Sequence, residues 1–152
     1  MMSIWEIIGR VIFWLTWPAL RLRLRFTTRT RVLIRCGNEI LVVKNWLGSG
    51  RWGLPGGGVK ANEDPLTTAL REVKEELNVV LKPSSCKKIG IFEYKSSGLS
   101  FVYSLYEVNL TKKPDVKRQK MEITNTLWVN KDKLNKDNSA SDVLQALQTI
   151  QR

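Results

Sequence analysis

Residues 52–79 constrain this chain more than any other stretch, because a glycine-rich loop runs directly into an acidic helix. Asp64 and Pro65 predict where the helix begins, since aspartate caps free N–H groups and proline at the first helical position loses no hydrogen bond. The apolar residues that follow recur at helical spacing and predict one apolar stripe. They are Leu66, Ala69, Leu70, Val73 and Leu77. The stretch therefore predicts an amphipathic helix.

A second face of this helix is acidic. At about 100° per residue, Glu72, Glu75 and Glu76 fall within an arc of about 100°. Carboxylates this close repel one another unless cations neutralise them, and their hard oxygen atoms suit Mg²⁺ or Mn²⁺. The alternative is a solvated face balanced by Arg71 and Lys74. Three consecutive glycines just before the helix favour the metal site, because glycine lets the backbone approach a ligand closely.

Gly57, Glu63 and the run from Arg71 to Glu76 resemble the signature of the Nudix hydrolases, the MutT-like family. The family has glycine where this chain has Asn78, and asparagine is the common substitute in the left-handed conformation that ends such a helix. The resemblance covers about residues 28–150 and implies an α/β/α sandwich with a mixed β-sheet. It also implies metal-dependent hydrolysis of a diphosphate bond in a nucleoside diphosphate linked to another group.

The resemblance implies a role for each residue of this signature. Glu72 and Glu76 would be the main metal ligands, assisted by Glu75 and by the carbonyl of Gly56. Gly57 would be structural. The metal would polarise the phosphate oxygens and make an attacking water more acidic.

Proton transfer and orientation fall to other side chains. Arg71 is expected to orient Glu63 and Glu75 through charge-assisted hydrogen bonds. The proton of the attacking water would go to Glu75 or to Glu122, which precedes Trp128 by six residues. An isolated glutamate such as Glu122 is otherwise an ordinary surface residue.

Substrate contacts are expected from an aromatic side chain and from a basic loop. Trp46 is placed to stack on a base or to pack against the domain. Lys112 and Lys113 belong to a basic segment, residues 111–120, which is either a solvated loop or a border of the substrate site.

Composition limits the chemistry and the partners. The net charge of +11 suits a polyanionic substrate, and it suits RNA or an anionic membrane equally well. Histidine is absent, so acid–base work falls to carboxylates, lysine or tyrosine. Cys36 and Cys86 fit no metal or redox spacing and are expected to be free thiols in a cytoplasmic enzyme.

The N-terminal residues 1–20 form a separate apolar and aromatic segment ahead of a hydrolase domain at 21–152. Its uninterrupted apolar run, residues 11–20, is half the length that spans a bilayer. Residues 1–25 therefore read as an interfacial helix on an anionic membrane, or as a helix packed on the domain or in a homodimer. Residues 21–26 alternate arginine with apolar residues and predict a strand.

The remaining periodicities predict a mixed sheet between helices. Strands are expected at 30–36, 39–45, 79–81, 88–94, 100–109 and 126–129, and a C-terminal helix after Ser139. The sequence leaves the substrate open and leaves two other functions open as well. One is a non-catalytic nucleotide-binding sensor, and the other is pyrophosphate removal from RNA 5′ ends, with RNA the less favoured partner.

Overall fold

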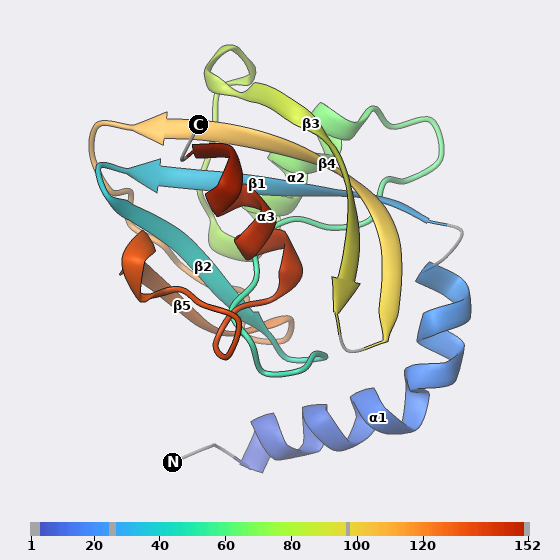
Figure 1. The fold of residues 1–152 in the computed structure, drawn as a ribbon. Coiled ribbons are helices and arrows are strands. Elements are labelled where there is room, and N and C mark those ends of the chain that lie inside the picture. The colour runs from blue at the N-terminus through green and yellow to red at the C-terminus, as the bar shows by residue number, and fades with distance from the viewer. Residues whose placement is uncertain (1–3, 25–26, 97, 151–152) are drawn as a thin grey trace.

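The computed structural model describes residues 4–24, 27–96 and 98–150. Its main elements are α1 (Ile4–Leu24), β1 (Thr28–Cys36), β2 (Glu39–Asn45), α2 (Pro65–Leu77), β3 (Lys87–Ser96), β4 (Leu99–Leu110), β5 (Ile123–Asn130) and α3 (Ser141–Ile150), shown in Figure 1. Short 3₁₀ turns, Pro83–Ser85 and Lys131–Lys133, precede β3 and follow β5.

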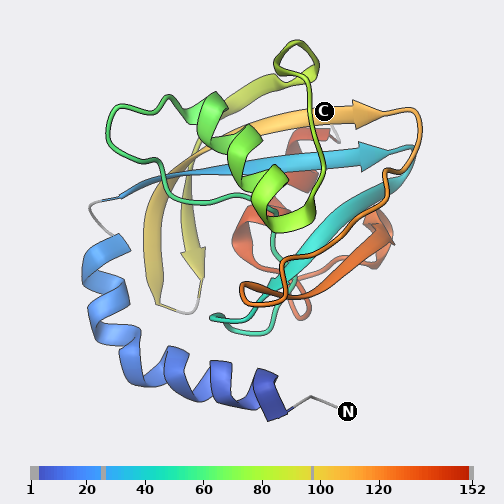
Figure 2. The ribbon, with the colours of Figure 1, turned by 180° about the vertical axis from the view of Figure 1, so that it is seen from behind.

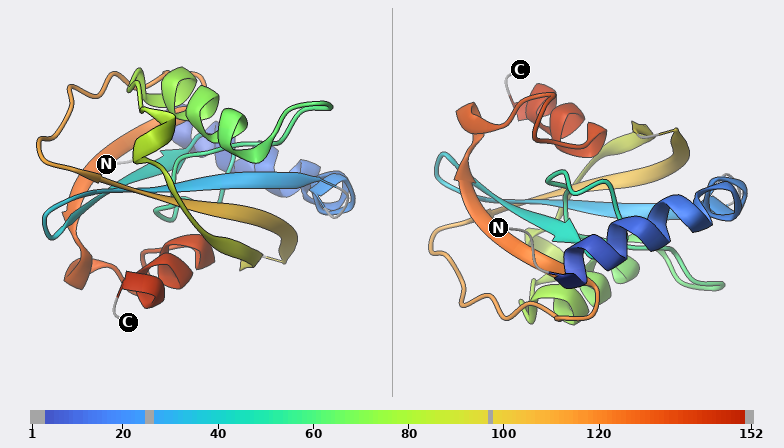
Figure 3. Two further views of the ribbon diagram at one scale, coloured as in Figure 1. Left: turned by 90° about the horizontal axis from the view of Figure 1, so that it is seen from above. Right: turned by 90° about the horizontal axis from the view of Figure 1, so that it is seen from below.

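The strands form one mixed sheet in the order β3-β4-β1-β2-β5. The central strand β1 pairs in parallel with β4 and antiparallel with β2, while the outer pairs β3–β4 and β2–β5 are antiparallel. Helix α2 covers one face of the sheet and α3 covers the other, as the view from above in Figure 3 shows. The predicted α/β/α sandwich with a mixed sheet is therefore confirmed.

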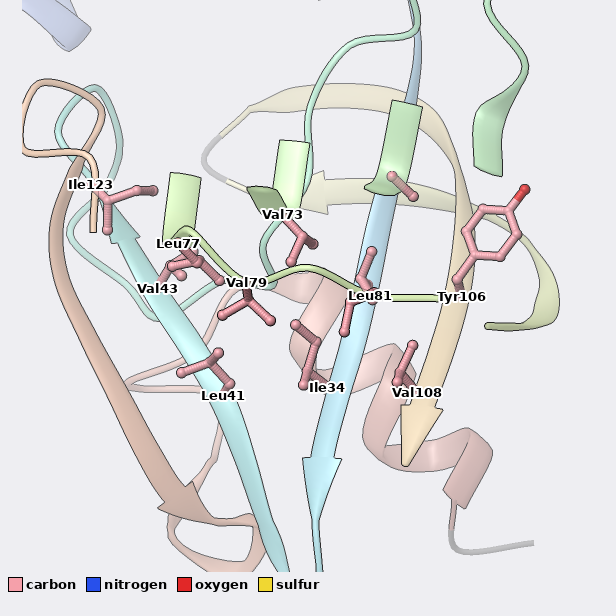
Figure 4. Close-up of a cluster of buried hydrophobic side chains, with 12 residues drawn as sticks. Ile34, Leu41, Val43, Val73, Leu77, Val79, Leu81, Tyr106, Val108 and Ile123 are labelled. Carbon is pink, nitrogen blue, oxygen red and sulfur yellow. The ribbon is translucent and has the colours of Figure 1, made fainter. Parts of the chain in front are cut away.

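The core between α2 and the sheet explains why the predicted apolar stripe forms a helix here. Val73 and Leu77 are fully buried and point from α2 toward the sheet, where Ile34 of β1 and Leu41 and Val43 of β2 meet them (Figure 4). Figure 2 shows α2 lying across the strands on this side. A second apolar cluster fills the space under α3 and includes Leu33, Ile40, Val42, Val143 and Leu147. Burial on both faces makes β1 and β2 a rigid base for the segments bonded to them.

Two predicted strands are wrong. Residues 79–81 form no strand, although Val79 and Leu81 are buried in the cluster beneath α2. These residues are apolar because they are buried, and not because they pair with a neighbouring strand. Residues 21–24 continue α1 up to Leu24, whereas residues 25 and 26 lie outside the described residues. Arginine and leucine are both strong helix formers, so an alternating pattern of these two residues fits either structure.

Helix α1 runs beneath the sandwich, close to the end of β2 and to the β3–β4 hairpin (Figures 1 and 3). Figure 1 shows it bending toward its C-terminal end, and Pro18 within the helix removes a backbone hydrogen bond and accounts for a bend. No helix in the described part of the chain is long and apolar enough to cross a membrane.

Candidate active site

The ends of α2 are defined by the capping residues that the sequence predicts. Asp64 Oδ1 accepts hydrogen bonds from the N–H groups of Leu66 (2.9 Å) and Thr67 (3.1 Å). At the other end, Asn78 adopts the left-handed conformation with φ of 55°, and its N–H reaches the carbonyl of Lys74. Asparagine therefore takes the position at which the family has glycine. The helix presents its acidic face between these two fixed points.

Arg71 is the hub of that acidic face. Its Nε and Nη2 atoms bind the two carboxylate oxygens of Glu63 at 2.9 and 3.0 Å, a bidentate arrangement. Its Nη1 atom binds Glu72 at 2.8 Å and Glu75 at 3.0 Å. The hydrogen bonds from Arg71 are the main reason why the pKa of Glu63 falls to about 2. Arg71 thus contacts Glu63 and Glu75 as expected, and it holds Glu72 in addition.

The glycine-rich loop lies against β1. The N–H groups of Thr30 and Val32 donate to the carbonyls of Gly57 (2.8 Å) and Pro55 (2.9 Å). At Gly57, an added Cβ would overlap the carboxyl group of Glu72. Gly56 has φ of 139°, and an added Cβ there would overlap the carbonyl of Thr30. Glycine is therefore required at both positions, at Gly57 to make room for a carboxylate and at Gly56 for the backbone conformation.

Glu76 turns toward this loop and is almost completely buried, with 5% of its surface exposed. Its Oε2 atom accepts a hydrogen bond from the Gly56 N–H at 3.0 Å. Burial is the main reason why the pKa of Glu76 rises to about 7, and the negative charges of Glu72 and Glu122 act in the same direction. Glu122, which comes from the segment before β5, therefore lies near Glu76.

A buried ion pair fixes the other side of the loop. Arg31 Nε and Asp142 Oδ2 are 2.9 Å apart, and both side chains are almost fully buried. Arg31 Nη1 also donates to the carbonyl of Gly56 at 3.0 Å, and Asp142 accepts from the N–H of Leu54 at 3.2 Å. The pair thus ties β1, the loop and α3 together. The sequence interpretation missed this role, because it gave neither Arg31 nor Asp142 a place in the site.

Arg29 is a second cation that the sequence interpretation missed. It lies two residues before Arg31 on β1, so the two side chains share one face of the strand. Its guanidinium carbon is 5.4 Å from the ring centre of Phe101, and its buried Nε atom has no hydrogen-bond partner in the described residues. Burial and the neighbouring Arg31 lower the pKa of Arg29 to about 10, while Glu72 and Glu76 oppose that shift. Arg29 therefore stays charged at neutral pH.

Some of these groups line a cavity of about 750 Å³, whereas Arg71 and the carboxylates that it holds, Glu63, Glu72 and Glu75, are not among its described lining residues. Its polar wall includes Arg29, Arg31, Glu76, Glu122 and Asp142. Its apolar wall includes Phe13, Trp46, Leu47, Leu54, Tyr94, Leu99, Phe101 and Met121. The lining thus combines charged groups with aromatic rings, which is what a ligand with a phosphate part and a flat apolar part requires.

The structure brings some of the predicted residues to the cavity and leaves others outside it. Gly56, Glu76, Glu122 and Trp46 line it, although Trp46 also stacks on Trp5 of α1 at 5.0 Å between ring centres. The two lysines predicted to border the substrate, Lys112 and Lys113, are not among the described lining residues. Lys113 instead forms an ion pair with Glu39, at the start of β2, and lies over the ring of Trp128 in β5.

The carboxylate oxygens of the acidic side chains are suitable ligands for a divalent cation, but these side chains do not converge on one point. In the described chain, no three acidic, histidine or cysteine side chains converge in a way that would hold a metal ion. The reason is visible in the contacts, because Arg71 holds Glu72 and Glu75 while the Gly56 N–H holds Glu76. A buried carboxylate with a raised pKa, next to a second carboxylate that a glycine accommodates, is nevertheless a donor set suited to Mg²⁺ or Mn²⁺.

Comparison with known proteins agrees with this geometry. The NUDIX domain family matches residues 25–148. Among solved structures, a MutT NUDIX hydrolase from Burkholderia pseudomallei superposes with a TM-score of 0.72 at 21% identity, covering 82% of this chain and 97% of that one. An Ap4A hydrolase from C. elegans gives a TM-score of 0.63 at 22% identity, covering 82% and 95%.

A larger protein shares the fold as well. The bifunctional NMN adenylyltransferase/ADP ribose pyrophosphatase from Francisella tularensis, complexed with AMP and a Mn ion, has a TM-score of 0.69 at 18% identity. The match covers 96% of this chain and 48% of that protein. At sequence identities this low, these superpositions show that the proteins share a fold with this chain, and they show no more than that.

Proposed function

This chain belongs to the Nudix hydrolase family, and we propose that it uses Mg²⁺ or Mn²⁺ to hydrolyse the diphosphate bond of a nucleoside diphosphate linked to another group. The observation that carries the proposal is the position of Glu76. This buried carboxylate is hydrogen-bonded to the Gly56 N–H, lines a cavity of about 750 Å³ and shares that cavity with Arg29. A buried carboxylate proposed to hold a metal and a guanidinium whose Nε has no hydrogen-bond partner in the described residues together suit a phosphate substrate.

Glu72, Glu75, Glu76 and the carbonyl of Gly56 would hold the metal. When bound, the cation supplies charge neutralisation on the phosphates and a lower pKa for the attacking water. Glu75 is half exposed and is held only by Arg71 in the contacts described, so it can turn from one to the other. The Gly56 carbonyl accepts from Arg31 and keeps a second lone pair for a ligand.

The chain's own cations and carboxylates would do the remaining work. Arg29 would bind a phosphate oxygen of the substrate through its unpartnered Nε and its terminal nitrogens. Arg31 would act as a positioning residue, because it holds the carbonyl of Gly56 while it is itself held by Asp142. Glu122, exposed at the edge of the cavity, and Glu75 are the two candidates to accept the proton of the attacking water.

The apolar wall supports a nucleotide as the substrate class. The cavity lining contains four aromatic rings against which a base can pack, Phe13, Trp46, Tyr94 and Phe101, and two of them, Tyr94 and Phe101, stack on each other. A cavity of about 750 Å³ is within the range that takes ligands of this size. The identity of the second group remains to be found by a substrate panel.

The central experiment is such a panel, with release of phosphate or nucleotide measured in Mg²⁺ and in Mn²⁺. Nucleoside triphosphates, sugar nucleotides, ADP-ribose and dinucleoside polyphosphates are the compounds to include. On the best substrate, Glu76→Gln should lower kcat by at least on the order of a hundredfold and keep the fold. Glu39→Gln is the matched control, since Glu39 pairs with Lys113 and is not among the described residues lining the cavity.

Two alternatives are read out by the same panel. A non-catalytic sensor would bind a nucleotide and turn over none of the compounds with either metal. An RNA 5′-end pyrophosphohydrolase would lose activity on RNA steeply with added salt and lose little on mononucleotides, because phosphate contacts along a chain release counterions. Turnover by Glu76→Gln at the wild-type rate would refute the assignment of the metal ligands.

Assembly and location are proposals independent of the chemistry. The division into residues 1–20 and a hydrolase domain at 21–152, a homodimer and a cytoplasmic location all follow from the sequence interpretation. Sedimentation velocity over a range of concentrations measures the dimer directly. Peripheral association with a membrane would use the outer side of α1, which is separate from the cavity. Failure of the hydrolase proposal would therefore not affect the membrane proposal.

A further inference from the structure

Helix α1 has two apolar faces, and only one of them contacts the domain. The inner face consists of Trp5, Gly9, Phe13 and Trp17, which recur every four residues. Trp5 stacks on Trp46, and the indole N–H of Trp46 donates to the Trp5 carbonyl at 3.0 Å.

The other inner residues are packed as closely. An added Cβ at Gly9 would overlap the carbonyl of Trp46, so no larger residue fits there. Phe13 is only 3% exposed and lines the cavity. The ring of Trp17 lies against Gly98 at the β3–β4 turn. The inner face therefore spans from the loop after β2 to the β3–β4 hairpin and forms part of the cavity wall.

The outer face of α1 is an uncovered apolar row. Seven of the thirteen large apolar residues that are exposed in the described chain belong to this one helix. They are Ile4, Trp5, Ile7, Ile8, Val11, Trp14 and Leu15. Except for Trp5, their spacing of three and four residues places them on one side of the helix. Exposed apolar side chains gathered in this way mark an interaction surface.

Charge identifies the partner of this surface. Helix α1 itself carries Arg10, Arg21 and Arg23 against Glu6 alone, and Arg21 and Arg23 follow the apolar row in its last turns. Two copies of a chain with a net charge of +11 repel each other when they meet through this end, whereas an anionic lipid surface attracts it. Trp14 in the row is a residue type that favours the depth of lipid headgroups.

We propose that the outer face of α1 docks on the anionic surface of a lipid bilayer, with the helix lying in the plane of that surface. The apolar row would enter the boundary between headgroups and acyl chains, and the arginines would bind anionic headgroups.

Docking also affects the cavity. The same helix carries Phe13 into the cavity wall, so a bilayer that holds α1 in place stabilises that wall. The enzyme would then act on diphosphates close to the membrane surface. This consequence rests on the proposed hydrolase function, whereas the docking itself does not.

The test uses the full chain and vesicles of phosphatidylcholine with and without phosphatidylglycerol, separated by sedimentation. The test variant carries Val11→Gln and Leu15→Gln. The matched control carries Val80→Gln and Ile91→Gln, since Val80 is 74% exposed and Leu15 is 75% exposed. Wild type and control should bind the anionic vesicles equally, and added salt should weaken both. The test variant should bind on the order of tenfold less or weaker still.

Other outcomes overturn the proposal. They are absence of wild-type binding, equal binding by test variant and control, or binding that does not depend on phosphatidylglycerol. A wild-type dimer that the Val11→Gln/Leu15→Gln variant dissociates, with no vesicle binding by either protein, would assign the row to a second copy of the chain. Glu76→Gln should bind vesicles as the wild type does, which separates the fate of this proposal from that of the hydrolase proposal.

Discussion

Replacing Asp142 by asparagine should destabilise the protein strongly, because it leaves a buried cation without its counter-charge. Asp142 and Arg31 are 2.9 Å apart, and their side chains are 2% and 8% exposed. The second carboxylate oxygen of Asp142 accepts from its neighbour Val143 at 2.9 Å. An asparagine can keep an acceptor on only one of these two sides, so its NH₂ group must face a donor on the other.

The size of the effect follows from this burial. Removing one partner of a buried ion pair costs about 3–5 kcal/mol, and we expect Asp142→Asn to fall in this range. For a chain of 152 residues, a loss of that size corresponds to a decrease in Tm on the order of 10 °C. Glu93→Gln is the matched control. The Glu93–Lys95 pair is at least half exposed, so its loss should cost far less stability than the loss of the buried pair.

The assay is urea denaturation followed by tryptophan fluorescence, with m-values compared to check that unfolding stays two-state. The double variant Arg31→Met/Asp142→Leu separates charge from packing. It should recover much of the lost stability, because no buried charge remains unpaired. Its hydrolytic activity should stay low, since nothing replaces the hydrogen bond from Arg31 to the Gly56 carbonyl.

A loss below about 1 kcal/mol for Asp142→Asn would refute this reasoning, since it would mean that water reaches the pair. A double variant less stable than either single variant would also contradict it, because the interaction would then depend on shape and not on charge.

Two further predictions concern the cavity. Arg29→Gln should raise KM about tenfold to a hundredfold and change kcat less, because a hydrogen bond to a charged phosphate is lost. The control Arg35→Gln, which breaks a pair between β1 and Glu107 of β4, should leave KM as it is. An unchanged KM in Arg29→Gln would rule out the phosphate contact. The pKa of Glu76 rises from its ordinary value of 4.5 to about 7, so the folded protein holds this proton more tightly than the unfolded chain does. Without metal, the free energy of unfolding should therefore decrease by about 3 kcal/mol as pH rises from about 4.5 to 7, and Glu76→Gln should lack this decrease. The measurement is the urea midpoint of each protein in EDTA at pH 5 and at pH 8. The same change in midpoint between the two pH values for wild type and Glu76→Gln would contradict the prediction.

The parts that could be predicted from sequence are those whose signals are local. Asp64, Pro65 and Asn78 mark the ends of α2 through caps within a few residues, and one turn separates Arg71 from Glu75. Gly57, which makes room for Glu72, lies in the loop just before the helix.

The parts that could not be predicted depend on distant contacts. Arg31 and Asp142 are 111 positions apart, and nothing local to either one indicates the other. One signal was present, since Arg29 and Arg31 are two residues apart around the start of the strand predicted at 30–36, and residues at that spacing share one face of a strand. The strand predicted at 21–26 failed for the opposite reason, because a short alternating pattern does not distinguish a strand from a helix when both residue types favour helices.

Phe13 has a consequence for how substrates should be inferred in this protein. In the proposed function the diphosphate chemistry belongs to residues 52–79, whereas Phe13, which lines the cavity proposed to take the attached group, comes from a helix that precedes the family-matched residues 25–148. Similarity within the matched residues is therefore a better guide to the type of bond that is hydrolysed than to the identity of the substrate. We expect a fragment trimmed to those residues to keep the reaction and to change in substrate specificity.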